Sequence, residues 1–513
     1  VGSEMCIRDR YYDSYDFLSR SEFSELGFEN DPNYGKRYTG GDKSLHAGSI
    51  RTSLSPQQTV RMPEAYYYDL HGRLVQSNGR NHLGGKDRYL ARYDFTGRPV
   101  QTRESHSSSA SGSQRGLTTT LAYDHDGRLS QRRTTLSSVT TPLTARYSYD
   151  EAGRLSEKTL GPTPVSYTYN VRGWIGKIAS APFVSELRYE NPRYGGDPLY
   201  SGMVSQWTWK HGQQPENDYV FSYDGVGRMV AAKHFVDGAR TDGYTERGIR
   251  YDANGNLLAI SRTAGGAVSD SLRFTLGGDV LLDVSGTSTG VFEYDPSGNL
   301  VKDGLNRLEF SYNCLNLMQT VQTTVGASKA QFTYGSDGRK LSEKARTGGF
   351  EYLGSLIYAY RGGTLSLAQA VTDEGTIQSA GVNYFIRDHL GSVRAVVDHT
   401  GKIVERNDYY PFGGRHENSA LSLSATNRYK FGGKETLEPV SLDMLDFGAR
   451  FYDPRIARWN TQDPLAEKYF SLSPYNYCAG NPVTVTDPDG RALLSLQNRS
   501  PIYDRQGKFL GTD

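Results

Sequence analysis

A heptapeptide that begins with Tyr-Asp and carries Gly at its fifth position recurs along the chain. Clear copies, such as YDHDGRL and YDEAGRL, begin at residues 68, 93, 123, 149, 223, 251 and 294, and weaker copies begin at 169 and 334. The copies start 20 to 54 residues apart. Recurrence of one unit at intervals of this length is typical of stacked arrays and not of separate globular domains. Any fold for this chain must therefore accommodate the same local structure many times.

Each copy predicts a strand, a turn and a second strand. Tyr favours strands, Asp can accept hydrogen bonds from its own backbone to open a turn, and Gly supplies the positive φ that a tight reversal needs. Alternating apolar residues then resume, as in GRLVQSN and GNLLAIS. No long segment keeps apolar residues at helical spacing. Nearly all of the chain is expected to form β-hairpins.

Composition indicates how so many hairpins are arranged. Open sheet edges invite aggregation, so the hairpins must close, form sandwiches or repeat over a long distance. The 513 residues include 57 Gly and 37 Tyr, and the mean hydropathy is −0.61. These values suit a sheet that is exposed to solvent on both faces and in which Tyr rings pack along neighbouring strands. We predict an all-β fold of repeated hairpins that spiral into a hollow shell or cocoon; several independent sandwiches are the alternative.

The charge balance and the cysteine content argue against several functional classes. Lys plus Arg number 58 and Asp plus Glu 57, so no long-range field attracts nucleic acid or an anionic membrane. Three cysteines provide neither a metal quartet nor a disulfide framework. No apolar run approaches the roughly 20 residues of a membrane span. We expect no nucleic-acid partner, no membrane span, no metal and no cofactor.

The repeats resemble the YD repeats of the Rhs family of bacterial polymorphic toxins and of the C components of insecticidal toxin complexes. From about Tyr384, the run YFIRDHLGSVR and the later stretch GARFYDPRIARW, which leads to a terminal DPDG, resemble the Rhs-repeat-associated core domain. The resemblance implies a β-ribbon spiralling into a cocoon. It also implies that the core domain closes one end and that the shell encloses a variable C-terminal toxin.

The resemblance divides the chain into parts. Residues 11–380 are expected to form the YD-repeat shell, residues 381–490 the core domain, and residues 491–513 the start of a variable C-terminal region. Residues 1–10, VGSEMCIRDR, resemble a translated sequencing adapter and are set aside as a scar. On this interpretation the natural N-terminus, with any signal peptide, is missing.

Asp-Pro pairs near the end of the core provide candidate catalytic residues. Asp-Pro is a common turn starter, so Asp453, Asp463 and Asp487 could simply shape the backbone. In the family that the chain resembles, two aspartates about two dozen residues apart converge and act like an aspartic protease on their own chain. That pattern selects Asp463 and Asp487. Two adjacent carboxyl groups do not both ionise easily, so one can accept a proton while the other donates one.

The resemblance also implies a cut shortly after Gly490, in the cleavage region Gly490, Arg491 and Ala492. Two features depart from the family: the aspartates are 24 positions apart, slightly further than expected, and Arg491 stands where many relatives have Leu. Arg450 and Arg458 are candidate supporting residues, because a nearby cation lowers a carboxyl pKa; surface or strand-pairing arginines are the alternative. At most a single-turnover autoprotease is expected.

Other motifs favour structural roles. GTSTG at 286–290 fits a serine-nucleophile pattern, but a strand follows where a nucleophile elbow needs a helix. YKFGGKE at 429–435 lacks the glycine spacing and the Ser/Thr of a phosphate loop. His389 lies in a predicted hairpin turn, and no second ligand at metal spacing accompanies it.

Two functions follow as hypotheses. The first is the shell-and-core portion of a secreted or cell-surface Rhs toxin that encapsulates and delivers a C-terminal effector. Its partners would be its own C-terminal toxin domain and a secretion or delivery apparatus. The alternative is a non-catalytic surface or adhesion protein whose YD repeats bind carbohydrate or a neighbouring cell.

Overall fold

The computed structural model describes residues 9–39, 44–55, 59–108, 114–416, 427–437, 442–495, 501–503 and 509–512. The described chain is almost entirely β-structure, with a few 3₁₀ turns and no α-helix among these residues. Of the ten residues assigned to the adapter scar, residues 1–8 lie outside the described part. Within the described residues, no helix has the length and apolar character needed to cross a membrane.

One antiparallel sheet of 34 strands, called the shell below, dominates the structure. Its strands are β1 (Asp9–Tyr12), β2 (His46–Leu54), β3 (Arg61–Tyr68), β4 (Leu74–Arg80), β5 (Lys86–Tyr93), β6 (Pro99–His106), β7 (Arg115–Tyr123), β8 (Leu129–Leu136), β9 (Leu143–Tyr149), β10 (Leu155–Leu160), β11 (Thr163–Tyr169), β12 (Ile175–Ala179), β13 (Val184–Arg188), β14 (Gln206–Lys210), β15 (Asn217–Tyr223), β16 (Met229–Val236), β17 (Ala239–Arg240), β18 (Glu246–Tyr251), β19 (Leu257–Ala264), β20 (Ala267–Gly277), β21 (Val280–Gly286), β22 (Gly290–Tyr294), β23 (Leu300–Asp303), β24 (Leu308–Tyr312), β25 (Met318–Thr323), β26 (Ser328–Gly335), β27 (Lys340–Ala345), β28 (Gly348–Leu353), β29 (Leu356–Arg361), β30 (Thr364–Thr372), β31 (Gly375–Gln378), β32 (Gly381–Arg387), β33 (Val393–Asp398) and β34 (Ile403–Arg406).

Smaller elements complete the fold. Four strands form a second sheet, and two short hairpins follow it: β35 (Glu435–Leu437), β36 (Leu442–Asp446), β37 (Phe451–Asp453), β38 (Arg458–Trp459), β39 (Val485–Thr486), β40 (Leu494–Ser495), β41 (Pro501–Tyr503) and β42 (Phe509–Thr512). The 3₁₀ turns are η1 (Asp16–Ser19), η2 (Ser21–Phe23), η3 (Phe431–Gly433), η5 (Ala466–Lys468) and η6 (Cys478–Gly480).

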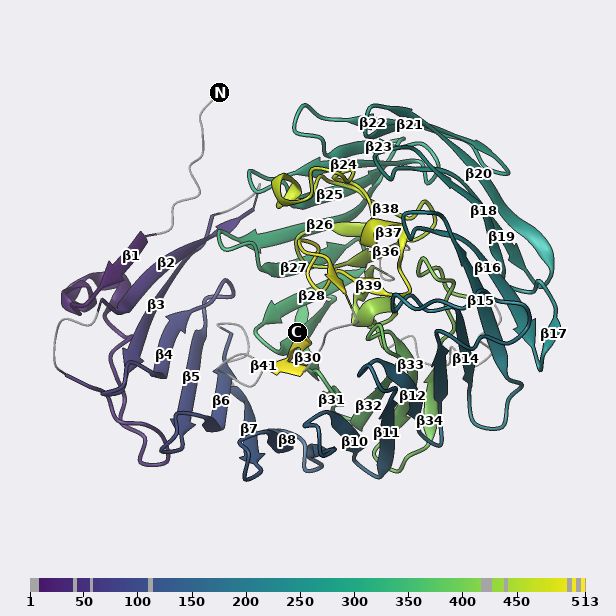
Figure 1. Cartoon of the computed structure of the whole chain (residues 1–513). Coiled ribbons are helices and arrows are strands. Elements are labelled where there is room, and N and C mark those ends of the chain that lie inside the picture. The colour runs from purple at the N-terminus through teal and green to yellow at the C-terminus, as the bar shows by residue number, and fades with distance from the viewer. Residues whose placement is uncertain are drawn as a thin grey trace.

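The shell strands follow one another as a meander that curves back on itself (Figure 1). The curve closes where β2 pairs with β26, with Ser53 opposite Gly335 and Leu54 opposite Tyr334. The ribbon then continues through β27–β34, in which β31 and β32 contact β9. The predicted all-β shell of spiralling hairpins is confirmed, and the alternative of independent sandwiches is wrong, because hydrogen bonds join these strands into one sheet.

The repeat turns share one pattern of side-chain contacts. In YDHDGRL, Asp124 Oδ1 accepts hydrogen bonds from the backbone N–H groups of Asp126 (3.0 Å) and Arg128 (2.8 Å), while its Oδ2 accepts from Arg128 Nε (2.7 Å). Gly127 has φ of 84°, which an L side chain adopts only with strain. The same Asp-to-Arg contact recurs at Asp69–Arg73, Asp94–Arg98, Asp150–Arg154 and Asp224–Arg228.

Each repeat also contacts the next one along the sheet. The guanidinium of Arg128 lies 4.8 Å from the ring centroid of Tyr149, and the Tyr149 hydroxyl donates to the carbonyl of Leu129 at 2.9 Å. The Arg side chain of one copy and the Tyr ring of the next are therefore in direct contact. The paired contacts recur at Tyr93, Tyr123, Tyr169 and Tyr251.

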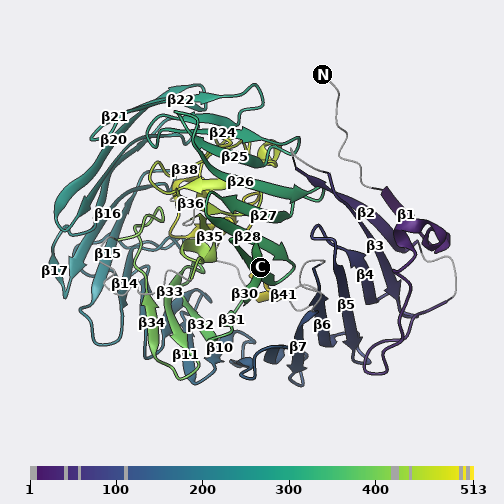
Figure 2. The same ribbon diagram turned by 180° about the vertical axis from the view of Figure 1, so that it is seen from behind.

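The second sheet, β35–β38, lies inside the curve of the shell in both views (Figures 1 and 2). We call residues 427–437 and 442–495 the plug. Phe451 of the plug packs against Phe332 of β26 with ring centroids 5.6 Å apart. Lys340 of β27 pairs with Glu435 at 2.7 Å and Asp446 at 2.6 Å. Both apolar and ionic contacts thus fix the plug to the shell.

The domain division expected at residue 381 stays a prediction. β32–β34, which follow that position, are hydrogen-bonded into the shell sheet, and the separate sheet begins only at Glu435. GTSTG at 286–290 includes the last residue of β21, the loop 287–289 and the first residue of β22, so a strand follows it, as the sequence predicts. Within the described residues, no group of three or more His, Cys, Asp or Glu side chains could hold a metal ion.

Candidate active site

Asp463 and Asp487 meet at Arg450 inside the plug. Arg450 precedes β37, Asp463 follows β38, and Asp487 follows β39 directly. Arg450 Nη2 lies 2.9 Å from Asp463 Oδ2 and 3.1 Å from Asp487 Oδ2, so both carboxylates share one nitrogen. The structure therefore brings together the two sequence-selected aspartates and one of the two supporting arginines.

Asp487 is enclosed by the loop that follows it. Its Oδ1 accepts hydrogen bonds from the backbone N–H groups of Gly490 (2.8 Å), Arg491 (3.0 Å) and Ala492 (3.4 Å). Burial raises the pKa of this carboxyl, although the Arg450 charge and the backbone donors oppose the shift. Asp487 is thus the member of the pair whose surroundings favour a protonated form.

Asp463 has a more open position. Its side chain is 9% exposed, compared with 0% for Asp487. Asp463 Oδ1 accepts from the backbone N–H of Leu465 at 2.7 Å, and the Asp463 backbone N–H donates to the carbonyl of Pro474 at 3.0 Å. The Asp-Pro turn therefore shapes the backbone and presents the carboxylate to Arg450 at the same time.

Arg450 contacts the expected cleavage region as well as the carboxylates. Its Nε donates to the carbonyl oxygen of Gly490 at 2.7 Å, and its Nη1 donates to the carbonyl of Pro474 at 3.1 Å. The guanidinium lies 4.2 Å from the ring centroid of Trp459. Burial lowers the pKa of Arg450 and the two aspartates oppose that shift; an arginine remains cationic in such a site.

The DPDG loop fits closely against the plug. Gly490 has φ of 76°, and a Cβ there would lie 3.1 Å from the backbone nitrogen of Arg450 and 3.3 Å from Phe447 Cβ. The Ala449 N–H donates to the carbonyl of Asp489 at 3.1 Å, and Lys434 Nζ donates to the carbonyl of Pro488. Glycine at 490 satisfies both the backbone conformation and this close approach.

Arg491, which departs from the family pattern, directs its side chain outward. The side chain is 48% exposed and pairs with Asp489 at 3.1 Å. The part of Arg491 that faces the Asp487 carboxylate is its backbone N–H, not its side chain. Position 491 therefore contributes its peptide group to the site, and its side chain occupies no enclosed pocket.

The other two candidates lie apart from the carboxylate pair. Arg458 donates to Asn256 Oδ1 at 3.2 Å and to the carbonyl of Asp279, both on shell turns, and it stacks on Tyr475. Asp453 Oδ1 accepts from the N–H of Arg455 at 2.8 Å and shapes a turn. Burial and the neighbouring Asp303 raise the pKa of Asp453 to about 7.

His389 is buried and has a structural environment. Its ring packs edge-on against Trp207, with the ring centroids 4.8 Å apart, and its Nε2 lies 3.0 Å from the carbonyl oxygen of Val483. Burial lowers its pKa to about 4, so the ring is neutral near pH 7. His389 thus links the shell to the plug, in agreement with its predicted structural role.

A family model described as the Teneurin YD-shell matches residues 200–477, which is more than half of the chain. The chain belongs to the Teneurin YD-shell family. The predicted membership of the Rhs/YD-repeat group is confirmed. The matched segment includes the later repeats and most of the plug.

Similar proteins include named toxins. The YD-shell chain is 25% identical over 353 residues to Double-stranded DNA deaminase toxin A of Burkholderia cenocepacia, a match that covers 58% of this chain and 23% of that protein. It is 31% identical over 151 residues to Toxin subunit YenC1 of Yersinia entomophaga, a match that covers 26% of this chain and 15% of that protein. It is 38% identical over 109 residues to Salivary gland surface protein 1 of Aedes aegypti, covering 21% and 3%. The chain spans less than a quarter of each relative.

Among solved structures, the TcdB2-TccC3 crystal structure aligns with 87% of this chain and 32% of its own. The TM-score is 0.44 and the sequence identity is 14%.

Proposed function

We propose that this chain is the shell and core portion of a secreted or cell-surface Rhs/YD-repeat toxin, which encloses and delivers a C-terminal effector and cuts its own chain after Gly490. The observation that carries the cleavage proposal is the placement of the Gly490–Arg491 peptide group. Its carbonyl oxygen accepts from Arg450 Nε, while its N–H donates to Asp487 Oδ1.

The fold supports a role in enclosure. The shell curves around the plug, and the plug carries the Asp463–Asp487 pair at the point where the chain continues toward residue 513. β39, which ends four residues before Gly490, lies inside the curve of the sheet (Figure 1). Toxin names among the relatives agree with an effector at this position, and a secretion or delivery apparatus would be its other partner.

The three side chains have complementary roles in the proposed reaction. Asp463, the more exposed carboxylate, removes a proton from a water molecule as the water oxygen bonds to the Gly490 carbonyl carbon. Arg450 Nε stabilises the negative charge that develops on the carbonyl oxygen. Protonated Asp487 then donates its proton to the Arg491 nitrogen as the carbon–nitrogen bond breaks. The products are a carboxyl terminus at Gly490 and an amino terminus at Arg491.

The reaction is intramolecular and occurs once. The DPDG loop holds the scissile peptide against the carboxylates through contacts with Ala449 and Lys434, so no substrate has to diffuse to the site. The outward side chain of Arg491 supports cleavage at this sequence, because no pocket selects for Leu there. A general protease activity on other proteins is not expected.

Intact mass spectrometry of the purified chain, in its present form and extended beyond residue 513, tests the proposal. We expect a cut after Gly490, with cleavage in Asp463→Asn and Asp487→Asn slowed about 100-fold or more, as loss of an acid or base usually causes. Asp197→Asn, which alters an Asp-Pro pair in a shell loop, is the matched control and should cleave normally. An uncut wild-type chain, or normal cleavage in either active-site variant, would refute the reaction.

A further inference from the structure

A lysine, a glutamate and two asparagines are buried together where the shell meets the plug. Glu405 lies on β34, and Asn407 follows it two residues later; Asn427 and Lys430 lie in the plug, just before η3. Glu405 and Asn407 have no exposed surface, and Lys430 is 2% exposed. The group therefore connects the end of the shell sheet with the first residues of the plug.

One carboxylate oxygen, Glu405 Oε1, accepts from the other three side chains. Lys430 Nζ and Asn407 Nδ2 each lie 2.6 Å from this oxygen, and Asn427 Nδ2 lies 3.2 Å from it. Two nitrogens that share one oxygen at hydrogen-bond distance are themselves neighbours. The amine of Lys430 is thus held beside the side-chain amide of Asn407.

Two oxygens of the same group have no donor. Within the described residues, Glu405 Oε2 and Asn407 Oδ1 are buried without a hydrogen-bond partner. Buried polar atoms are nearly always paired, so these two oxygens need an explanation. A proton moved from Lys430 to Glu405 would convert the carboxylate into a donor, and an amide oxygen is the kind of acceptor that a carboxyl O–H requires.

The surroundings of the group are apolar. Glu405 is paired in register with Val396 of β33, which belongs with Val393 to a small buried core cluster. The Val393 carbonyl accepts from Asn407 Nδ2 at 3.2 Å and from the Tyr409 hydroxyl at 3.0 Å. An ammonium and a carboxylate are costly to bury in such a place. A reaction that converts the amine into a neutral amide removes this cost.

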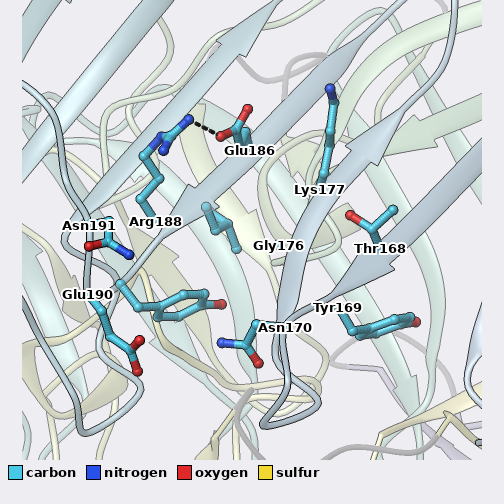
Figure 3. A pocket seen from close by; sticks show the side chains of 11 residues that line it. Thr168, Tyr169, Asn170, Gly176, Lys177, Glu186, Arg188, Glu190 and Asn191 are labelled. Carbon is cyan, nitrogen blue, oxygen red and sulfur yellow. Dashed lines mark ion pairs between the residues drawn. The ribbon is translucent and has the colours of Figure 1, made fainter.

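Two other lysines show what is particular to Lys430. Lys177 of β12 is exposed and stands at a cavity of the shell (Figure 3). Lys340 is buried and lies 2.7 Å from Glu435 Oε2, but that oxygen also accepts from the hydroxyl of Tyr352, which has no carbonyl carbon to react with. Lys430 combines burial with a carboxylate and a side-chain amide on one oxygen.

We propose that Lys430 and Asn407 form an intramolecular isopeptide bond, with Glu405 as the group that moves the protons. Glu405 takes one proton from Lys430 Nζ, and this nitrogen bonds to Asn407 Cγ. A second proton passes from the same nitrogen through Glu405 to Asn407 Nδ2, the Cγ–Nδ2 bond breaks, and ammonia leaves. The products are a secondary amide between the two side chains, a protonated Glu405 and ammonia, so no oxidant or other reactant is needed.

Asn407 is a better partner for Lys430 than Asn427. The Asn407 amide lies nearer to Glu405, whereas Asn427 Oδ1 already accepts from the backbone N–H of Tyr429 at 3.0 Å. A bond to Asn407 joins β34 to the plug covalently. It does not depend on cleavage after Gly490, because both bonded residues precede that position.

Intact mass spectrometry and tryptic mapping of the denatured wild-type chain test the proposal. We expect the chain to be lighter than its sequence by one ammonia molecule. Trypsin should release a branched peptide in which NDYYPFGGR (407–415) is joined to YKFGGK (429–434) and Lys430 is not cut. A chain of full sequence mass would overturn the proposal. Loss of ammonia without the branched peptide would also overturn it, because ring closure at an asparagine gives the same mass.

Variants test the roles of the individual residues. Glu405→Gln keeps the amine and the amide but removes the proton carrier, so it should show the full sequence mass and no branched peptide, and Lys430→Gln should do the same. Asn427→Ser and Lys177→Gln are the controls and should retain the bond. Thermal unfolding checks that each variant folds. Formation of the bond in Glu405→Gln, or its loss in Asn427→Ser, would contradict the assigned roles, and the wild-type mass decides the proposal even where a variant does not fold.

Discussion

The repeat turns of the shell, called the wall below, and the plug both contain ion pairs between aspartate and arginine. The two regions differ in the number of aspartates that each arginine serves. In the wall, each aspartate of the YD repeats Asp69, Asp94, Asp124, Asp150 and Asp224 has an arginine of its own, and these carboxylates are between 13% and 26% exposed. In the plug, two more deeply buried aspartates share Arg450. One cation cannot neutralise two ionised carboxylates, so the plug favours a state in which one of them holds a proton.

The pKa directions follow from this difference. In the wall, burial opposes ionisation of Asp94, but hydrogen bonds from Thr96 and Arg98 outweigh it and lower the pKa to about 2. In the plug, burial prevails over Arg450 and raises the pKa of Asp487. The same residue type is therefore a fixed anion that shapes a turn in one region and a candidate acid in the other.

Removal of the shared cation should have the largest effect on stability. We expect Arg450→Met to lower the free energy of unfolding at pH 7 by about 3–5 kcal/mol, because two buried carboxylates lose the ion-pair partner that they share. Arg458→Met is the matched control: Arg458 is equally buried but donates to neutral oxygens, and its loss should cost about 1–3 kcal/mol. Urea unfolding measures both, and equal losses would contradict the contrast.

Removal of a single wall carboxylate should cost less. Asp124→Ala deletes the acceptor for the N–H groups of Asp126 and Arg128, so we expect a loss of about 1–2 kcal/mol. Asp124→Asn retains an acceptor oxygen and loses only a partly exposed ion pair, which should cost less than about 1 kcal/mol. If the two variants were equally unstable in urea, the charge and not the turn would be the main contribution.

The contact between repeats should contribute least per residue. Tyr149→Phe keeps the ring beneath Arg128 and removes only the hydrogen bond to the Leu129 carbonyl, so we expect a loss of about 0.5–1 kcal/mol. Tyr200→Phe, at an exposed loop position, should leave the midpoint of urea unfolding unchanged. A larger loss at Tyr149 would indicate that the hydroxyl, and not the stacked ring, joins adjacent repeats.

The sequence predicts the wall better than the plug because the wall depends on short-range contacts. Tyr, Asp and Gly of YDHDGRL determine a turn within five residues, so the hairpins and their repetition could be inferred directly. The stack of Arg128 on Tyr149 was not inferred, because it joins consecutive copies across intervals that vary along the chain.

In the plug, family resemblance selects Asp463 and Asp487, but sequence cannot separate the two arginines of ARFYDPRIARW. They lie on opposite sides of the β37–β38 turn, and only folding directs Arg450 to the carboxylates and Arg458 to the shell. Lys434 was missed for the same reason. Its contact with the Pro488 carbonyl depends on how β35 lies against a loop more than fifty residues later.

The dependence of stability on pH should differ in sign between the two regions. Asp487 has a folded-state pKa above its ordinary 3.8, so its contribution is fully present below pH 3.8 and is lost as pH rises through the folded-state pKa. Asp94 has a folded-state pKa of about 2, so its contribution is present above pH 3.8 and is lost as pH falls toward 2.

Carboxyl ¹³C NMR measures both groups in the folded protein, with Asp487→Asn and Asp94→Asn used for assignment. We expect the Asp487 resonance to titrate above pH 3.8 and the Asp94 resonance to titrate well below it. If Asp487 titrated as low as Asp94, Arg450 would outweigh burial and hold both plug carboxylates ionised. The protonated acid that cleavage after Gly490 requires would then be missing, and the plug would be chemically equivalent to the wall.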